Sequence, residues 1–187
     1  MRISLSEGSW DKSTADIVAI AVASGKTKLG RTFGRIEAAT GRGSIKPLAA
    51  DERFEGKRTQ TLKVAAGGKA KARWLLLVGI GDEKNAEKIA SKMGQAESSR
   101  ARSLKSAAIE LPEVSPESVR PASQGLVSGS YRYDEYKSDK AAGAALGSAA
   151  ILGAPKGTRG LSAAVRAGKA IAESVNFARD LVNAPPN

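Results

Sequence analysis

The stretch Arg73-Trp-Leu-Leu-Leu-Val-Gly-Ile-Gly81 decides the fold class, because it joins the strongest strand signal in the chain to a turn. Residues 74–78 are apolar at consecutive positions, which is typical of a β-strand buried on both faces. Asp82 can then cap a helix over residues 85 to about 105. One side of that helix carries Ala86, Ile89, Ala90 and Met93.

The same alternation of strand and helix continues along the chain. Strands are predicted at residues 15–23, 59–64, 106–111 and 149–152, and helices at residues 28–40 and 116–129. Ser115 is the expected cap of the second helix, with Pro116 at its first position. Residues 141–152 are rich in Ala and Gly, so composition alone also permits a helix there. This order predicts an α/β fold with a mixed, mostly parallel sheet flanked by helices.

A long helix is predicted near the C-terminus. It begins near Gly157, with Thr158 as its cap, and it ends before Pro185 and Pro186. Apolar residues at helical spacing form a stripe that consists of Leu161, Ala164, Val165, Gly168, Ile171, Ala172, Val175, Ala178 and Val182. We expect this stripe to pack on the sheet or to remain partly exposed.

Residue types that are missing restrict the chemistry. The 187 residues include no Cys and no His, which excludes disulfides, thiolate sites and nucleophilic arrangements of Ser-His-Asp or Cys-His type. The N-terminus has no apolar stretch of signal-peptide length. No run of about 18 apolar residues occurs, so no membrane span is predicted. A reducing, cytoplasmic setting fits these features.

The chain is strongly basic, with 30 Lys and Arg against 19 Asp and Glu and a net charge of +11. Such an excess favours contact with polyanions but does not determine a fold. Two windows, residues 26–35 and 57–73, contain no acidic residue. We interpret them first as solvated surface and second as a nucleic-acid contact. The few aromatic residues do not interleave with these bases, which argues against a platform for single strands.

Two patterns could form a ligand site, and each has a plainer interpretation. Gly79-Ile-Gly81-Asp82 lies between a strand and a helix, where backbone N–H groups can receive a phosphate. The dinucleotide fingerprint needs another Gly at the position of Lys84, so a turn without a ligand is favoured. Three acidic pairs do not converge, so solvated carboxylates are favoured over a metal site; they are Asp51-Glu52, Asp82-Glu83 and Asp134-Glu135. We assign no catalytic, cofactor-binding or metal residue.

All three tyrosines lie within residues 129–138, at Tyr131, Tyr133 and Tyr136. Each offers an apolar ring with a hydroxyl that needs a partner when buried. The plainer interpretation is a packed lid over helix ends. The functional interpretation is an aromatic contact between subunits or domains.

Four segments, in order, resemble the N-terminal domain of leucyl aminopeptidases, the cytosol aminopeptidase family. They are Phe54-Glu-Gly-Lys57 with Gln60-Thr-Leu62, then residues 73–81, then Tyr131-Arg-Tyr-Asp-Glu-Tyr-Lys-Ser138, and finally residues 167–187. The last segment ends in Phe177-Ala-Arg-Asp-Leu-Val-Asn-Ala-Pro-Pro-Asn187 and is similar to the family's linker helix and its Asn-x-Pro-x-Asn junction. The chain departs from the family over residues 141–150, where members usually have a more apolar strand.

This resemblance implies a macro-domain-like α/β unit over residues 1–155. It also implies an interdomain linker helix, with the start of a catalytic domain, over residues 156–187. The parent protein would be a hydrolase, a leucyl aminopeptidase that releases N-terminal residues, often leucine, from peptides. It would use two divalent metals (Zn, Mn or Mg). The family's metal ligands lie in the C-terminal domain and match no residue here, so this chain alone is expected to be inactive.

The leading hypothesis is therefore a non-catalytic N-terminal domain of a cytoplasmic, metal-dependent leucyl aminopeptidase, with a role in assembly and in access to the active site. Its partners would be its own catalytic domain and other subunits, since the family is usually hexameric. The alternative is a basic macro-like module that binds DNA, as some bacterial members do, or a nucleotide. A third hypothesis is an unrelated, stand-alone nucleotide-binding domain.

Overall fold

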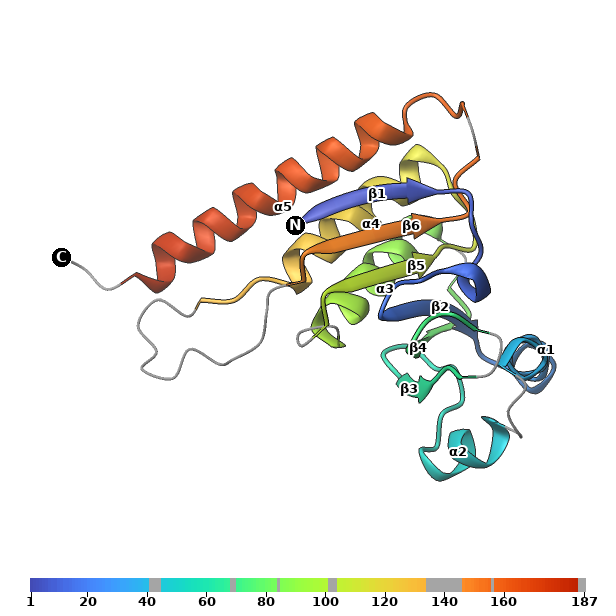
Figure 1. Cartoon of the computed structure of the whole chain (residues 1–187). Coiled ribbons are helices and arrows are strands. Elements are labelled where there is room, and N and C mark those ends of the chain that lie inside the picture. The colour runs from blue at the N-terminus through green and yellow to red at the C-terminus, as the bar shows by residue number, and fades with distance from the viewer. Residues whose placement is uncertain are drawn as a thin grey trace.

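The computed structural model describes residues 1–40, 45–67, 70–83, 85–100, 104–133, 146–155 and 157–184. These residues form one six-stranded sheet with the strand order β1-β6-β5-β2-β4-β3 (Figure 1). Neighbouring strands are parallel except for β3, which lies antiparallel to β4. The strands are β1 (Arg2–Ser6), β2 (Ile17–Ala23), β3 (Thr61–Ala65), β4 (Trp74–Gly81), β5 (Ser106–Glu110) and β6 (Ser148–Leu152).

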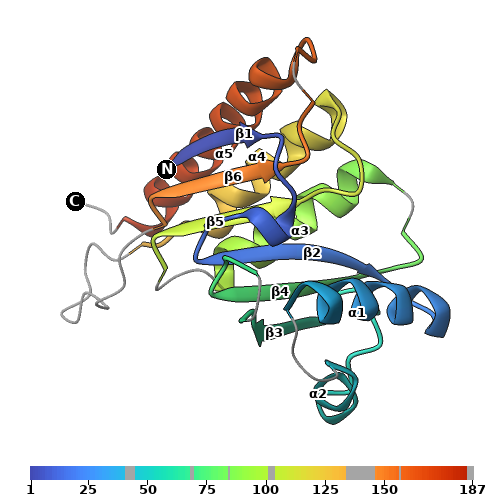
Figure 2. The same ribbon diagram turned by 45° about the vertical axis from the view of Figure 1, so that its right-hand side comes forward.

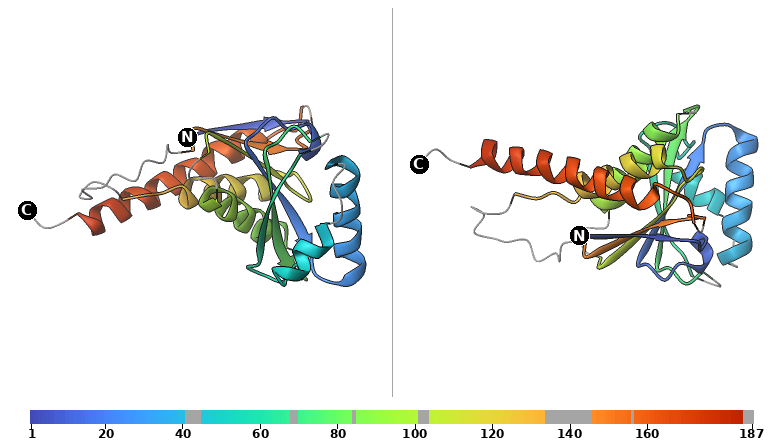
Figure 3. Two further views of the ribbon diagram at one scale, coloured as in Figure 1. Left: turned by 60° about the horizontal axis from the view of Figure 1, so that its bottom comes forward. Right: turned by 90° about the horizontal axis from the view of Figure 1, so that it is seen from above.

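Helices lie on both faces of this sheet, as Figure 2 and Figure 3 show. They are α1 (Lys26–Thr40), α2 (Ile45–Asp51), α3 (Ala86–Arg100), α4 (Pro116–Gly129) and α5 (Leu161–Asn183), with a short 3-10 helix η1 (Trp10–Lys12). Met93 of α3, Leu126 of α4 and Leu161 of α5 share one apolar core. Phe33 of α1 and Ile45 of α2 belong to the core on the opposite face. The predicted α/β fold with a mostly parallel sheet is confirmed.

The centre of the sheet is the parallel pair β2 and β4. Ile17 lies opposite Trp74 and Ile20 lies opposite Leu77. Leu76 enters the core under α3, whereas Leu77 enters the core under α1 and α2, and both are fully buried. Burying one such side chain contributes about 1.5–3 kcal/mol. This is the strand, buried on both faces, that the run at residues 74–78 predicts.

The sequence does not predict three elements, and several predicted boundaries are wrong. The three elements are β1, η1 and α2, and β4 continues through Gly79 to Gly81 rather than ending before them. Residues 148–152 form the strand β6, so the alternative of a helix there is wrong. Leu104 and Lys105 are not helical, so α3 does not extend to residue 105 as expected. None of the described helices is both long enough and apolar enough to cross a membrane.

Two predicted helix caps are also wrong. Asn85, not Asp82, caps α3, because the Asn85 Oδ1 accepts a hydrogen bond of 2.9 Å from the Lys88 backbone N–H. Asp82 instead accepts from the Ser24 hydroxyl at 2.9 Å. Gly160, with φ of 86°, precedes α5, while the Thr158 hydroxyl donates to the Pro155 carbonyl at 3.3 Å. The predicted cap of α4 is confirmed, since the Ser115 hydroxyl accepts from the Ser118 backbone N–H.

Three glycines allow α3, α4 and α5 to pack at close range. A Cβ atom on Gly94 of α3 would lie 2.5 Å from the Ala122 carbonyl oxygen of α4. On the other side of α4, a Cβ atom on Gly168 of α5 would lie 2.2 Å from the Arg120 carbonyl oxygen. The third, Gly125 of α4, lies equally close to α3, 2.5 Å from the Ser91 carbonyl oxygen by the same measure. Larger side chains at these positions would push the helices apart.

Asp16 connects the beginnings of β2 and β5. Its Oδ2 accepts hydrogen bonds from the backbone N–H groups of Lys105 and Ser106 and from the Ser106 hydroxyl, at 2.9–3.0 Å. Desolvation raises the pKa of Asp16, but the hydrogen bonds from Ser106 and Lys105 outweigh it, so the pKa lies below its usual value.

We expect Gly94→Ala to lower the free energy of unfolding by about 1–3 kcal/mol, because the added methyl group overpacks the contact between α3 and α4. Urea unfolding followed by circular dichroism measures this change. The matched control is Gly30→Ala in α1, where an added Cβ meets no atom within 4 Å. That variant should gain about 0.5–1 kcal/mol, because Ala favours a helix over Gly. Equal effects of the two substitutions would contradict the close approach of the helices.

A second prediction concerns acid. The charged form of Asp16 should stabilise the fold fully above pH of about 4, the pKa of an unfolded Asp, and this contribution should disappear as the pH falls through the lower folded-state pKa. Asp16→Asn should therefore lower stability near pH 7 and reduce the loss of stability between pH of about 5 and about 3. Urea unfolding across this range tests it, with Asp51→Asn as the control at an exposed helix end. Identical acid profiles for wild type and Asp16→Asn would show that the prediction is wrong.

Candidate functional site

Helix α5 divides into a packed half and an exposed half. The packed half is buried against α4 through Leu161, Ala164, Gly168 and Ala172. The C-terminal half of α5 extends past the amino ends of the strands, as Figure 1 and both panels of Figure 3 show. The predicted apolar stripe is therefore buried over its first part, whereas Ile171, Val175 and Val182 are exposed.

The exposed half of α5 carries large apolar side chains on more than one side. Phe177 and Leu181, one turn apart, are 64% and 62% exposed, and Val182 is 84% exposed. Val175 and Val182 lie about 140–160° around the helix from Phe177, given about 3.6 residues per turn. The apolar side chains therefore cover roughly half of the helix circumference, and an exposed apolar face of this size is normally covered in a larger structure. We take this half of α5 as the candidate functional site, a contact surface.

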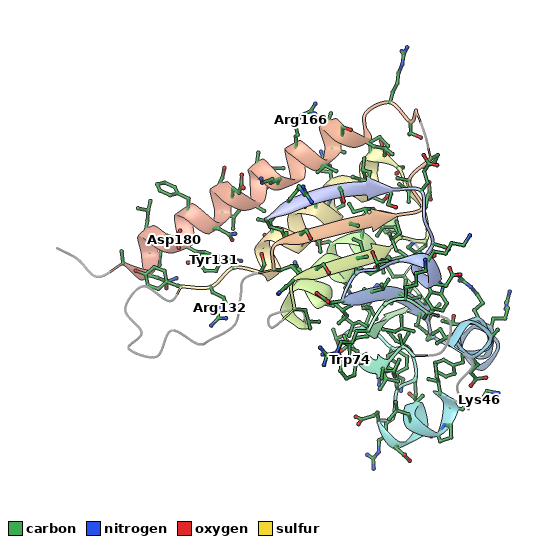
Figure 4. The ribbon with its side chains drawn as sticks, in the orientation of Figure 1. Lys46, Trp74, Tyr131, Arg132, Arg166 and Asp180 are labelled. Atoms are coloured by element: carbon green, nitrogen blue, oxygen red, sulfur yellow. The ribbon has the colours of Figure 1, made fainter. Side chains whose placement is uncertain are left out.

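Tyr131 holds this exposed half in place. Its hydroxyl donates to the Asp180 carboxylate at 2.8 Å and accepts from the Asn183 side-chain amide at 3.4 Å. The Arg179 guanidinium lies over the Tyr131 ring, 5.4 Å from its centroid. Figure 4 shows Tyr131 beside Asp180 at the far end of α5. Desolvation and the hydrogen bond to Asp180 raise the pKa of Tyr131, which keeps the donated proton on the hydroxyl.

Tyr131, the first of the three tyrosines, thus contacts the end of α5. A groove of about 700 Å³ adjoins this contact, and its lining includes Tyr131 and Arg179 together with Lys92 of α3. Tyr136, which the sequence also singled out, lies outside the described residues. Asp180 and Asn183 were not recognised from the sequence, because their only signal is their position in the junction motif.

The turn at Gly79–Asp82 is closed by the protein's own backbone. The Gly79 N–H donates to the Gln60 carbonyl and the Gly81 N–H donates to the Gly56 carbonyl, both at 2.8 Å. A Cβ atom on Gly79 would lie 2.1 Å from the Lys57 carbonyl oxygen. These two N–H groups therefore bind the segment 54–60 and are not available to a phosphate. This backbone pairing favours the interpretation of the segment as a turn without a ligand.

Gln60 braces the segment that covers this turn. Its Oε1 accepts hydrogen bonds from the backbone N–H groups of Glu55 and Lys57, at 2.9 and 3.0 Å. Its Nε2 donates to the Arg53 carbonyl at 2.9 Å. One side chain therefore satisfies three backbone groups of a segment that has no regular secondary structure. The sequence marked Gln60 as part of a family motif but did not reveal this role.

Several basic residues of the two acid-free windows have acidic partners elsewhere in the chain. Arg35 pairs with Glu110 at 3.5 Å, Arg58 pairs with Glu83, and Lys57 pairs with Glu55. Lys63 and Arg73 lie over the Trp74 ring, 4.6 and 5.8 Å from its centroid. The side chains of Lys26, Lys28 and Lys69 lie outside the described part. Part of the local positive charge is therefore balanced in the fold.

The acidic pairs do not form a site in the described part of the chain. Asp82 and Glu83 have separate partners, Ser24 and Arg58. Asp51 and Glu52 are exposed at the end of α2, and Asp134 and Glu135 lie outside the described residues. Among the residues that the structure describes, no group of three or more Asp or Glu could hold a metal ion.

Comparison with known proteins assigns this chain to a family. The model of the cytosol aminopeptidase family, N-terminal domain, matches residues 17–140. The chain belongs to the cytosol aminopeptidase family. A probable cytosol aminopeptidase of Methylorubrum extorquens is 36% identical over 150 residues, which cover 74% of this chain and 29% of the relative. One of Sulfurihydrogenibium sp. is 28% identical and covers 100% of this chain and 38% of the relative.

Two solved structures show the same fold at low identity. A mutant of tomato leucine aminopeptidase gives a TM-score of 0.80 at 22% identity, over 99% of this chain and 38% of that one. A macrodomain of Oceanobacillus iheyensis with MES bound gives a TM-score of 0.54 at 10% identity, over 92% of both chains. The α/β unit is thus macro-domain-like. This cytosol aminopeptidase domain spans 29–38% of the length of the two relatives described above.

We expect Tyr131→Phe to loosen the far end of α5, because the hydrogen bond to Asp180 is lost while the ring remains. Native-state hydrogen exchange should accelerate several-fold at the amides of residues 176–183. The amides of residues 164–172 serve as the internal control and should exchange as in the wild type. Unchanged exchange at residues 176–183 would contradict an anchoring role for Tyr131.

Proposed function

We propose that this chain is a non-catalytic N-terminal domain that docks onto the catalytic region of a leucyl aminopeptidase through the exposed half of α5. One observation carries the proposal, namely the exposure of Phe177, Leu181 and Val182 on a helix held in place by Tyr131. Apolar side chains of this size are normally buried against a partner. The length of the relatives supports this partner, since they are about two and a half times as long as this chain.

The chemistry of peptide hydrolysis is proposed to reside in that catalytic region. The chain has no Cys or His, and its described carboxylates do not fit a two-metal centre. We propose that the parent enzyme binds two divalent metals (Zn, Mn or Mg) outside these 187 residues. There they would polarise the scissile carbonyl and activate water. The residues of this chain would hold the domain in position without touching the substrate.

Assembly and setting are further parts of the proposal. The buried cores of interfaces between identical subunits are more apolar than the rest of a protein surface, so we propose that this domain helps to form the hexamer typical of the family and limits access to the active sites. A cytoplasmic location fits relatives named cytosol aminopeptidases.

The alternative, a basic module that binds DNA or a nucleotide, has less support. The observation in favour of this alternative is the net charge of +11. Arg35, Arg58 and Lys57 are paired with carboxylates, and the Gly79 and Gly81 N–H groups are hydrogen-bonded within the protein. DNA affinity that falls steeply with rising salt would favour this alternative.

The docking proposal predicts a complex between this chain and the separately expressed catalytic region of the parent protein. Size-exclusion chromatography should show the complex. The double variant Phe177→Asp, Leu181→Asp should weaken it at least about tenfold, because the contact would bury unpaired carboxylates. The chain alone, with Mn²⁺ or Zn²⁺, should release no leucine from a chromogenic leucine amide.

Ser162→Asp is the matched control, since Ser162 is exposed on the packed half of α5. It adds one negative charge, half of what the double variant adds, and should leave the complex unchanged. Both variants replace exposed residues, so circular dichroism should show a native fold. Undiminished binding by the double variant would remove the docking proposal, and measurable turnover by the chain alone would remove the non-catalytic role.

A further inference from the structure

A cavity of about 600 Å³ lies between α1, α2 and the segment 53–60. α1 and α2 lie on the face of the sheet opposite α5 (Figure 2), so the proposed docking surface does not use this cavity. Its lining comes from three separate parts of the chain, represented by Phe33 of α1, Ala49 of α2 and Phe54 of the following segment.

The floor of the cavity is apolar and firmly packed. Phe33 and Phe54 are each 6% exposed and belong to the core that also contains Ile45 and Ala49. A hydrogen bond fixes the backbone after α2, since the Phe54 N–H donates to the Ala49 carbonyl at 2.7 Å. A ligand in the cavity would therefore meet a preformed apolar surface.

Positive charge surrounds this floor. Lys46, Arg53 and Lys57 line the cavity, with Glu55 as the one carboxylate among the lining residues. Glu55 forms an ion pair with Lys57. Among the described residues, no carboxylate pairs with Arg53. Figure 4 labels Lys46 beside α2, on the side toward α1. The cavity therefore combines an apolar floor with a net positive rim.

The backbone conformation of Arg53 is unusual and is held in place by its neighbours. Its φ of 50° lies in the left-handed region, which costs a non-glycine residue roughly 1–2 kcal/mol. Gly is the common choice where a helix ends in this way, and Arg53 directly follows the last turn of α2. Gln60 holds the Arg53 carbonyl in this conformation. Because this backbone conformation is unfavourable for an arginine, we expect the Arg53 side chain to have a function of its own.

We propose that this cavity binds a small ligand that combines an apolar body with a carboxylate. The apolar body would contact Phe33 and Phe54, and the guanidinium of Arg53 would take the carboxylate through two parallel hydrogen bonds. Such a carboxylate occurs on a free apolar acid and on the C-terminus of a peptide that ends in an apolar residue. The inference is independent of the docking role of α5.

The test uses calorimetric titration of the whole chain with three probes. N-acetyl-L-leucine represents the free acid, and acetyl-Ala-Ala-Leu represents a peptide end. N-acetyl-L-leucinamide has the same apolar body without the carboxylate. We expect one or both acids to bind and the amide to bind at least about tenfold more weakly, because charge-assisted hydrogen bonds to the carboxylate are lost. The stronger of the two acids identifies the source of the ligand.

Arg53→Gly is the decisive variant, because Gly adopts the left-handed backbone without strain. Its melting temperature should not fall, while the dissociation constant for the acid should rise at least about tenfold. Lys71→Gln removes a positive charge outside the cavity and should leave the affinity unchanged. Three results would each overturn the proposal: no binding of either acid at millimolar concentration, equal binding of the amide, or undiminished binding by Arg53→Gly.

Discussion

The pairing of β2 with β4 is the contact on which the rest of the structure depends. Both strands send side chains into both cores, so each helical layer needs this pair to bury its apolar side. The end of β4 also positions the segment 54–60, through the hydrogen bonds of Gly79 and Gly81. That segment in turn shapes the cavity beneath α1 and α2, while on the other face α4 packs on α3 and carries α5.

Burial explains which elements could be predicted from the sequence. β2, β4 and β5 are apolar at consecutive positions and are recognisable without knowledge of their neighbours. β1 has only two apolar residues, Ile3 and Leu5, among polar ones, so its own strand signal is weak. It exists because it pairs with β6, whose sequence positions are distant. α2 contains Pro47 and only seven residues, so it too depends on packing rather than on its own propensity.

The site was harder to predict, because its interactions join residues that are far apart in sequence. The contact of Asp82 with Ser24 displaced the expected cap, and the contact of Tyr131 with Asp180 spans a similar separation. The apolar stripe of α5 is continuous in sequence, so no pattern marks the point at which α4 ceases to cover it. The family resemblance came from short motifs, whereas the roles of Gln60 and Arg53 required the folded backbone.

The anchoring of α5 by Tyr131 has a thermodynamic consequence for association. A flexible terminal segment must lose conformational entropy when it binds, and each immobilised residue subtracts from the affinity. Here the hydrogen bond to Asp180 and the stacking of Arg179 order the segment beforehand. A partner that meets Phe177 and Leu181 therefore finds them already arranged on a rigid helix, and most of the energy of burying them remains available for affinity.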